Sequence, residues 1–288
     1  MSDKEKYINF IQERNDIYVP LFQQPFWLDN FAEKWDVVLY ETDERIVAAL
    51  PFCLKGNLFT RRIYLPDVSF YQSILFFEEK KEIQQQVTLA LFEKLPKTIK
   101  QYFKFLPEYS LLSLGEINYK RTDYTTYLIT KKNTLSKHHQ RKINKAGNSN
   151  YMILINEKTE EAYHLMRQTF ERQKVKIKLS FAGFEHLYQV SKRYDCGNLY
   201  ICIDTENNIL AIAFIVSDKQ TNYYLYGAFN IAYKNSGAMH FLLNQMIEKT
   251  LQENKTFNFC GSSKLSIAQF FEGFGAGKAT IPIWTKLL

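Results

Sequence analysis

The sequence predicts an α/β (α+β) protein built from two copies of one unit, each a mixed, mostly antiparallel sheet flanked by helices. The first observation is an internal similarity between ETDERIVAALPF, from Glu41, and DTENNILAIAFI, from Asp204, with Thr, Ile and Ala identical at matching positions. The second is that each stretch precedes a further strand, a long helical segment and another strand. The third is a length of 288 residues with 46% hydrophobic residues, enough for two ordinary globular domains.

In the first half, the polar turn inside ETDERIVAALPF separates two apolar runs, and we expect a hairpin there. RRIYLP is the expected third strand. A helical segment from Glu79 to Leu95 then leads into the strand IKQYFKFL. A chance likeness between two unrelated hairpins is the alternative to a true repeat.

The second half opens with a strand, NYMILIN, followed by the helices TEEAYHLMRQTFERQ and SFAGFEHLYQVSKRY. The hairpin, the strand TNYYLYGAF, a helix from Ser236 to Glu253, the strand FNFC, the helix SIAQFFEGF and the strand ATIPIWTKL complete it. The face of the first helix that we expect to be buried consists of Ala162, Leu165, Met166, Thr169 and Phe170. We therefore predict one module at residues 1–130, a basic linking helix at 131–149 and a second module at 150–288.

Charge and cysteine usage limit the classes of function. The formal net charge of +7 favours anionic partners such as nucleotide phosphates, tRNA or an acidic lipid face. The four cysteines have no CxxC spacing, so the sequence indicates neither a zinc site nor a disulfide framework. The charged N-terminus, MSDKEKYINF, and a longest apolar run of strand length, Ile209 to Val216, predict a cytoplasmic protein without integral membrane association.

Three stretches carry a resemblance to a known family: LSKHHQRKINKA at 135–146, LYICIDTENNILAIAFIV at 199–216 and NFCGSSKLSIAQFFEGFGA at 258–276. Together with the order β-α-α-β-β-β-α-β-α-β, they resemble the GNAT acyltransferase fold and, within it, the Fem-type (FemAB-like) double-GNAT transferases. The resemblance implies two tandem GNAT-like modules. It also implies acyl or aminoacyl transfer to an amine without a metal, a covalent enzyme intermediate or a permanently bound cofactor.

In GNAT folds the third and fourth strands splay apart to form the cleft, which here implies TNYYLYGAF and TFNFC. Tyr224 and Tyr226 alternate on the first of these, and we expect both side chains on one face. Either hydroxyl is a candidate catalytic group that orients the donor or protonates the leaving group, with cross-strand packing as the alternative. For a general base, Glu272 and the histidines are candidates without a recognisable constellation.

The segment KNSGAM aligns with the GNAT loop whose backbone N–H groups hold the pyrophosphate of coenzyme A. The candidate cofactor-binding residues are Lys234, Ser236, Gly237 and Ala238, and they leave an acyl-CoA donor open. Met239 stands where the family has glycine or alanine, and an ordinary helix N-terminus is the alternative. This departure favours an enzyme of the Fem type that does not use coenzyme A.

The segment KKNTLSKHHQRKINK contains six Lys or Arg residues, and no acidic residue occurs between Asp123 and Glu157. We expect a helix from about Leu135 with Gly147 as its C-terminal cap, and Lys137, Arg141 and Lys142 as candidate substrate-binding residues. The residues expected to face the protein are Leu135, His139, Ile143 and Ala146. An anionic or nucleotide-linked substrate, or aminoacyl-tRNA, would suit such a helix, and a solvated charged face is the alternative.

Two further groups complete the candidate substrate site. Gly261, Ser262 and Ser263 follow a strand, where small residues let the backbone approach a ligand, although either serine can instead cap the next helix. Phe70, Tyr71 and Gln72 follow the third strand of the first half, where the family's first module contributes an acceptor surface. Core packing is the alternative for the phenylalanine.

These observations predict a transferase that moves an acyl or aminoacyl group from an activated donor to an amine by positioning and backbone oxyanion stabilisation. A conventional acetyl-CoA-dependent N-acetyltransferase is one alternative, and KNSGAM separates the two. A non-catalytic binding module for an anionic polymer is the other, favoured by the missing base.

Overall fold

The computed structural model describes residues 1–288 except residues 15, 79–80, 133, 263 and 288, and it divides into two compact units. The first unit is Met1–Tyr124 with Thr280–Leu288, and the second is Thr125–Ala279, which includes the predicted linking helix. The predicted module boundaries at residues 130 and 150 stay predictions, because contacts alone do not show which segments fold independently.

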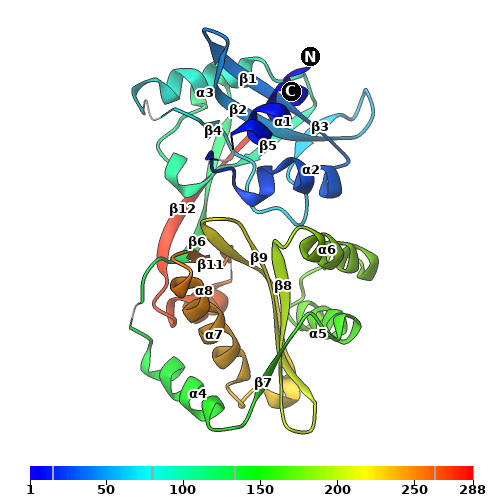
Figure 1. The fold of residues 1–288 in the computed structure, drawn as a ribbon, viewed down its shortest axis with the longest axis vertical. Helices are drawn as coiled ribbons and strands as arrows, with labels where there is room; N and C mark the ends of the chain where they lie inside the picture. The colour runs from blue at the N-terminus through cyan, green and yellow to red at the C-terminus, as the bar shows by residue number, and fades with distance from the viewer. Residues whose placement is uncertain (15, 79–80, 133, 263, 288) are drawn as a thin grey trace. The chain divides into compact units, whose positions relative to one another are not determined.

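The first unit contains helices and strands in the order expected of the first half (Figure 1). Its helices are α1 (Asp3–Glu13), α2 (Pro25–Phe31) and α3 (Gln84–Glu93), and its strands are β1 (Lys34–Thr42), β2 (Arg45–Lys55), β3 (Arg62–Tyr64), β4 (Leu75–Phe76) and β5 (Lys100–Lys104). Short 3-10 helices occupy Leu21–Gln23, Lys81–Ile83, Pro107–Tyr109 and Gly115–Ile117. The strand order is β1-β2-β3-β5, and β4 pairs with β2.

Residues 152–272 of the second unit follow the predicted order of elements, and a helix at residues 137–147 precedes them. Its helices are α4 (Lys137–Gly147), α5 (Thr159–Arg172), α6 (Phe181–Arg193), α7 (Ala238–Gln252) and α8 (Leu265–Glu272), with a 3-10 helix at Ile231–Tyr233. Its strands are β7 (Met152–Ile155), β8 (Gly197–Ile203), β9 (Ile209–Ser217), β10 (Thr221–Phe229) and β11 (Thr256–Asn258). Two long strands, β6 (Lys120–Ile129) and β12 (Gly277–Leu287), contribute residues to both units. In the second unit the strand order is β6-β11-β10-β9-β8-β7.

The predicted internal repeat is confirmed by the strand pairing. Both similar stretches form antiparallel hairpins, β1–β2 and β8–β9, and each hairpin pairs with a third antiparallel strand, β3 or β10. That strand then pairs in parallel with the strand that follows the long helix, β3 with β5 and β10 with β11. The parallel pairing requires a crossover, which α3 and α7 supply.

Helices cover both faces of the second sheet (Figure 1). Because side chains alternate along a strand, neighbouring residues of β9 face opposite layers. Ile215 packs in a cluster with residues of α7 and α8, whereas Phe214 contacts Phe184 of α6 with ring centroids 5.6 Å apart. On the α8 side the rings of Phe259 and Phe271 stack at 4.3 Å. The core therefore forms two apolar layers, one on each side of the sheet.

The last strand differs from its expected place. ATIPIWTKL was expected to complete the second half, but Ile283–Leu287 pair antiparallel with Lys100–Lys104 of β5 in the first unit. Phe105 also donates its backbone N–H to the Pro282 carbonyl at 3.0 Å. Trp284 of this strand packs in the first unit's core with Phe103. The apolar pattern identified the strand correctly, but it carried no information about which strand it pairs with.

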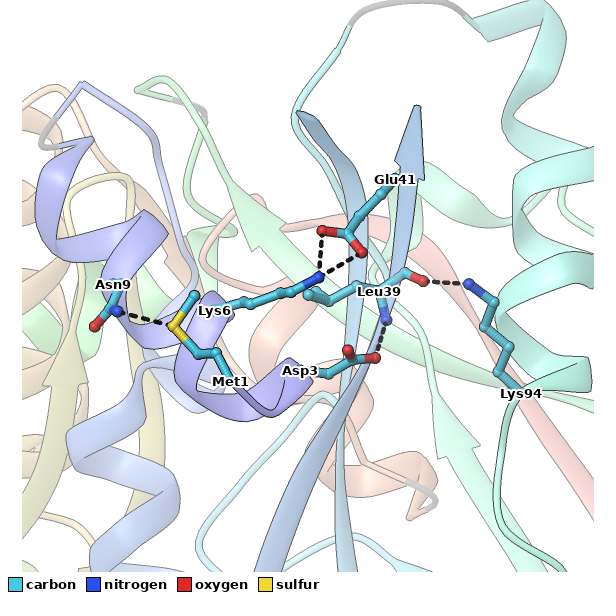
Figure 2. A network of polar contacts seen from close by, with 7 residues as sticks. All are labelled: Met1, Asp3, Lys6, Asn9, Leu39, Glu41 and Lys94. Carbon is cyan, nitrogen blue, oxygen red and sulfur yellow. Dashed lines mark hydrogen bonds and ion pairs between the residues drawn. The ribbon is translucent and has the colours of Figure 1, made fainter. Parts of the chain in front are cut away.

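Side chains cover the outer strand β1 of the first unit (Figure 2). The Leu39 N–H donates to Asp3 Oδ2 of α1 at 3.3 Å, and Lys94 Nζ donates to the Leu39 carbonyl at 2.8 Å. Lys6 Nζ donates to both carboxylate oxygens of Glu41 at 2.9 Å. The contacts of Asp3 and Lys94 thus satisfy backbone groups of Leu39 that a neighbouring strand could otherwise bond.

The longest apolar run of the sequence lies within β9, as its length predicts. None of the described helices has the length and apolar character that crossing a bilayer requires.

Candidate functional site

The two strands expected to splay apart do diverge. β10 and β11 pair in parallel from Thr221–Tyr223 to Thr256–Asn258, and β10 continues from there to Phe229. On the other side, the Phe259 N–H donates to the Tyr127 carbonyl of β6 at 3.0 Å, so the chain after β11 follows β6 rather than β10. This divergence is the feature that positions the donor carbonyl in GNAT folds.

Tyr224 lies at the start of the divergence, on the face of the sheet that α7 and α8 cover. Its ring lies 6.4 Å from Phe257 and 6.1 Å from Phe259, and burial raises the pKa of its hydroxyl. A Cβ atom at Gly227 would overlap the Tyr224 hydroxyl, so only glycine at that position leaves room for it. Tyr224 is therefore a protonated phenol that can donate a hydrogen bond.

Tyr226 does not share that face, contrary to the expectation from simple alternation. Tyr224 pairs with Ile215 and Tyr226 with Phe214, so a bulge at Leu225 shifts the register by one residue. Since Ile215 and Phe214 face opposite layers, the two tyrosines do as well. Tyr226 and Tyr224 thus cannot act together on one face, and sequence periodicity gives no sign of such a bulge.

The Gly-Ser turn after β11 has an unusual backbone. Cys260 and Gly261 both have positive φ, 57° and 73°, and Asn258 Oδ1 accepts the Cys260 N–H at 2.9 Å. Ser262 Oγ accepts the N–H of Lys264, the residue that precedes α8, so it bonds within the turn rather than to the helix. Ser263 lies outside the described residues. The turn redirects the chain, and its substrate contact stays a prediction.

The basic helix α4 is held on α8 through His139. Ser136 is its N-cap, since Ser136 Oγ accepts the His139 N–H, and the same oxygen lies 2.9 Å from Nδ1 of that ring. His139 Nε2 lies 2.9 Å from the Phe270 carbonyl, which can only accept, so Nε2 carries the proton. A Cβ atom at Gly273 would overlap the His139 ring. The ring therefore fits against α8 only because this corner is glycine.

The inward face of α4 is the predicted one. His139 and Ala146 are buried, and Leu135 and Ile143 pack against the second unit's core. The sequence indicated which residues point inward, but it did not reveal their contact with the Phe-Gly corner. The only signal in the sequence for this contact is a phenylalanine-rich helix that ends in glycines. No characteristic spacing along the chain relates that helix to His139.

The same helix covers the N-terminus of α7 (Figure 1). Gly237 precedes that helix with φ of +82°, and a Cβ atom built on it would overlap the Lys142 carbonyl oxygen and lie 3.4 Å from the Ala146 Cβ. Lys145 Nζ donates to the Asn235 carbonyl at 3.0 Å. Backbone and side chain of α4 thus occupy the space directly outside Gly237, where a GNAT pyrophosphate would approach.

The other predicted cofactor-binding residues surround this contact. Ser236 Oγ accepts the Ala238 N–H at 3.1 Å, Ala238 is buried, and Lys234 is exposed. The structure thus brings Ser236, Gly237 and Ala238 together at the helix start. It also places the backbone of α4 against the glycine on which the phosphate-binding role depends. A role for these residues in binding a cofactor stays a prediction.

The predicted substrate-binding cations of α4 differ in their exposure. Lys137 and Arg141 are exposed and Lys142 is half-buried. Lys137 and Arg141 line an open pocket of about 720 Å³. The other lining residues are Lys132, Thr134, Leu135 and Gln140. The pocket presents cations and amide or hydroxyl groups, a set that suits a phosphate-bearing ligand.

Phe70, Tyr71 and Gln72 lie in the first unit and are all buried. The Gln72 side chain makes no hydrogen bond through either of its polar atoms. Lys104 Nζ lies 3.3 Å from the ring centroid of Phe70 and 4.4 Å from that of Tyr124. A buried amide without hydrogen bonds is costly in a folded core, so the Gln72 side chain is a polar feature of the first unit that a bound ligand would explain.

Titratable groups near α4 are arranged to stay neutral. Burial lowers the pKa of His139, and burial together with the neighbouring His139 and His138 lowers the pKa of His240 to about 3.

Burial raises the pKa of Cys53, Cys196 and Cys202 to about 12, so these thiols are not nucleophiles at neutral pH. Within the part of the chain that the structure describes, no group of three His, Cys, Asp or Glu side chains could hold a metal ion.

Several solved structures are similar to this chain. No protein-family model matches the chain, and no curated protein sequence does. The chain is similar to FemX, with 13% identity, a TM-score of 0.72, and 97% of this chain and 95% of that one covered. It is also similar to L-PGS from Bacillus licheniformis, with 13% identity, a TM-score of 0.59, and 98% and 92% covered. A tandem GNAT protein from the clavulanic acid biosynthesis pathway matches with 9% identity, a TM-score of 0.53, and 99% and 94% covered.

Each of these likenesses spans both units, and at such low identity it concerns the fold. The chain therefore has the double-GNAT fold that FemX and the tandem GNAT protein share.

Proposed function

We propose that the protein is a transferase that moves an acyl or aminoacyl group from an activated donor to an amine, and that coenzyme A is not its donor. The observation that carries the second part is the contact between Gly237 and the Lys142 carbonyl. The backbone of α4 lies directly against Gly237 and leaves no room there even for a Cβ atom. A pyrophosphate would have to displace α4 to take that place.

The donor or acceptor would instead bind through the outer side of α4. Lys137 and Arg141 face the open pocket, and the helix that carries them is fixed by His139 at one end and by the contact between Lys145 and Asn235 at the other. Fixing the helix reduces the entropy lost on binding. A nucleotide-linked substrate or the phosphates of an aminoacyl-tRNA match this set of cations.

The reaction would take place where β10 and β11 diverge. The amine nitrogen forms the new C–N bond to the donor carbonyl carbon, the C–O bond to the donor breaks, and the proton lost by the amine ends on the leaving oxygen. Tyr224 is a suitable hydrogen-bond donor to that oxygen, because a tyrosine hydroxyl is protonated at neutral pH and burial raises its pKa further. Most of the rate enhancement would come from positioning and from backbone N–H groups at the carbonyl.

The test is a pair of calorimetric titrations of the purified protein, one with acetyl-coenzyme A and one with a mixture of aminoacyl-tRNAs at several salt concentrations. We expect no saturable heat with acetyl-coenzyme A and salt-dependent binding of tRNA. The double variant Arg141→Gln and Lys142→Gln should weaken tRNA binding. It should also reduce the slope of log K against log salt by about one for each phosphate that these side chains neutralise.

The matched control removes the same two charges from α6, as Lys192→Gln with Arg193→Gln, and should leave tRNA binding unchanged. Saturable coenzyme A binding that is lost on Gly237→Glu would contradict the proposal and support a conventional N-acetyltransferase. tRNA binding without transfer from any aminoacyl donor to small amines would support the non-catalytic binding module.

A further inference from the structure

Two large apolar side chains are exposed at the tip of a loop in the first unit. The loop between β2 and β3 carries Leu58 and Phe59, whose side chains are 74% and 83% exposed. Large apolar residues are usually placed where they can be buried, and two neighbouring ones at the end of a hairpin are a distinct feature. The nearby Ile99 is also exposed, and its N–H donates to the Arg61 carbonyl at 2.9 Å. We call Leu58, Phe59 and Ile99 the apolar tip.

The loop has internal bonds that keep these side chains outward. Asn57 Oδ1 accepts hydrogen bonds from the Phe59 N–H, the Thr60 N–H and the Thr60 hydroxyl, at 3.0, 3.1 and 3.0 Å. Gly56 has φ of +90°, and a Cβ atom there would lie 2.7 Å from the Thr60 carbonyl oxygen. Hydrogen bonds within the loop thus fix its conformation, so the loop would lose little conformational freedom on binding.

Cations surround the apolar tip. The segment 55–62, KGNLFTRR, contains Lys55, Arg61 and Arg62 and no carboxylate, and the adjacent segment 94–104 contains four lysines and no carboxylate. The two segments are neighbours because Arg62 pairs with Lys100. Beside Leu58 lies an open pocket of about 850 Å³, and Arg61, Lys97 and Lys286 are among its lining residues. The carboxylates nearest to the tip are Glu33, which accepts the Gly56 N–H, and Glu93 and Glu116 on the pocket wall.

From this arrangement we infer that the apolar tip is a docking surface for an anionic phospholipid bilayer, with Leu58 and Phe59 entering the interface and Arg61, Arg62, Lys97 and Lys100 contacting headgroup phosphates. An exposed apolar pair next to several cations matches the two layers of a bilayer surface, anionic outside and apolar within. A stable protein interface needs a broad surface of about 1,200–2,000 Å² in total, which two projecting side chains do not provide. This inference is independent of the chemistry proposed for the second unit.

The experiment is co-sedimentation of the full chain with vesicles of phosphatidylcholine, or of phosphatidylcholine mixed with phosphatidylglycerol, at low and high salt. We expect partitioning into the mixed vesicles that weakens as salt rises. Leu58→Ser with Phe59→Ser should lower the partition coefficient about tenfold or more, since each side chain loses its apolar transfer free energy. Arg61→Gln with Arg62→Gln should lower it by about tenfold at low salt and by less at high salt.

The matched control is Leu111→Ser, which removes an equally apolar side chain, 94% exposed, from another loop of the same unit and should not change partitioning. All substituted side chains are exposed or half-buried, so thermal melting should show each variant folded. The inference is overturned if the wild-type chain stays in the supernatant with anionic vesicles, or if removing Leu58 and Phe59 leaves its partitioning unchanged. A dimer seen by analytical ultracentrifugation that is lost on Leu58→Ser would assign the tip to a second copy instead and would equally overturn it.

Discussion

The hairpins of the two units form the same pattern but have different outer neighbours. In the second unit the outer strand of the hairpin, β8, pairs with β7. In the first unit the equivalent strand β1 comes first in the strand order, and Asp3 and Lys94 bond to the backbone of Leu39. The outer backbone groups of β8 thus bond to a neighbouring strand. The backbone groups of Leu39 in β1 bond to side chains instead.

The second difference lies in what each unit adds around its crossover helix. The second unit has α4 against the N-terminus of α7, which brings a row of cations to the surface. The first unit retains a buried, unpaired Gln72 and an exposed apolar tip. The second unit therefore differs from the first by a surface rich in cations, and the first unit by its exposed apolar tip and buried amide. The four predictions below test that difference.

The largest effect should come from Gly237→Ala. The new Cβ would overlap the Lys142 carbonyl oxygen at a positive φ, so α4 must move away from α7. We expect a loss of about 3 kcal/mol in the free energy of unfolding, from backbone strain and weakened packing together. Urea denaturation measures it. Gly147→Ala is the control, because a Cβ at Gly147 meets nothing within 4 Å. Equal stability of the two variants would mean that α4 does not pack on α7 as described.

Acidification should destabilise the same contact. The folded-state pKa of His240 is lowered to about 3 from an ordinary value of 6.5, so the unfolded chain takes up the proton first as pH falls. The stabilisation is complete above pH 6.5 and is lost progressively between pH 6.5 and about 3. We expect a loss of roughly 1.5 kcal/mol by pH 5, after allowing for partial exposure. Denaturation midpoints across this range test it. His240→Leu should reduce this pH dependence and leave the part that the lowered pKa of His139 contributes, whereas His164→Gln should leave it unchanged. A profile unaffected by His240→Leu would show that His240 does not contribute to it.

Lys94→Met should weaken the side-chain cover of β1. Losing the hydrogen bond from Lys94 Nζ to the Leu39 carbonyl should lower the free energy of unfolding by about 1 kcal/mol and open the edge to pairing with other chains. Thermal melting combined with light scattering checks both effects. Lys34→Met, an exposed lysine at the start of the same strand, serves as the comparison. If both variants behave alike, the edge does not depend on this contact.

Gln72→Leu should have the smallest effect on stability and an opposite sign. Because the amide of Gln72 is buried without partners, an apolar side chain of similar size should leave stability unchanged or raise it by less than about 1 kcal/mol. If the residue lines an acceptor-binding surface, as predicted, KM for the acceptor should rise while kcat stays similar. A destabilised variant with unchanged KM would show that Gln72 is structural.

Local features could be predicted from the sequence, whereas contacts between residues distant in the chain could not. The hairpins and the inward face of α4 follow from periodicity, which depends on neighbours a few residues away. The bulge at Leu225 changes one residue of register without changing composition, and it put Tyr226 on the other face. The contact between Gly237 and Lys142 joins segments that no local pattern relates. The roles of the candidate site residues stay predictions, because contacts within the protein do not identify a substrate.

The pairing of β12 with β5 has a consequence for biosynthesis. Residues 283–287 belong to the first unit, yet the ribosome makes them only after the whole of Thr125–Ala279. The first unit therefore remains without one of its strands throughout translation of the second, with the edge of β5 and the place of Trp284 unfilled. Domains usually complete in the order in which they are synthesised, but here the earlier unit must wait for the later one. A nascent chain of this protein would be most exposed to misassembly and to chaperones at its N-terminal half.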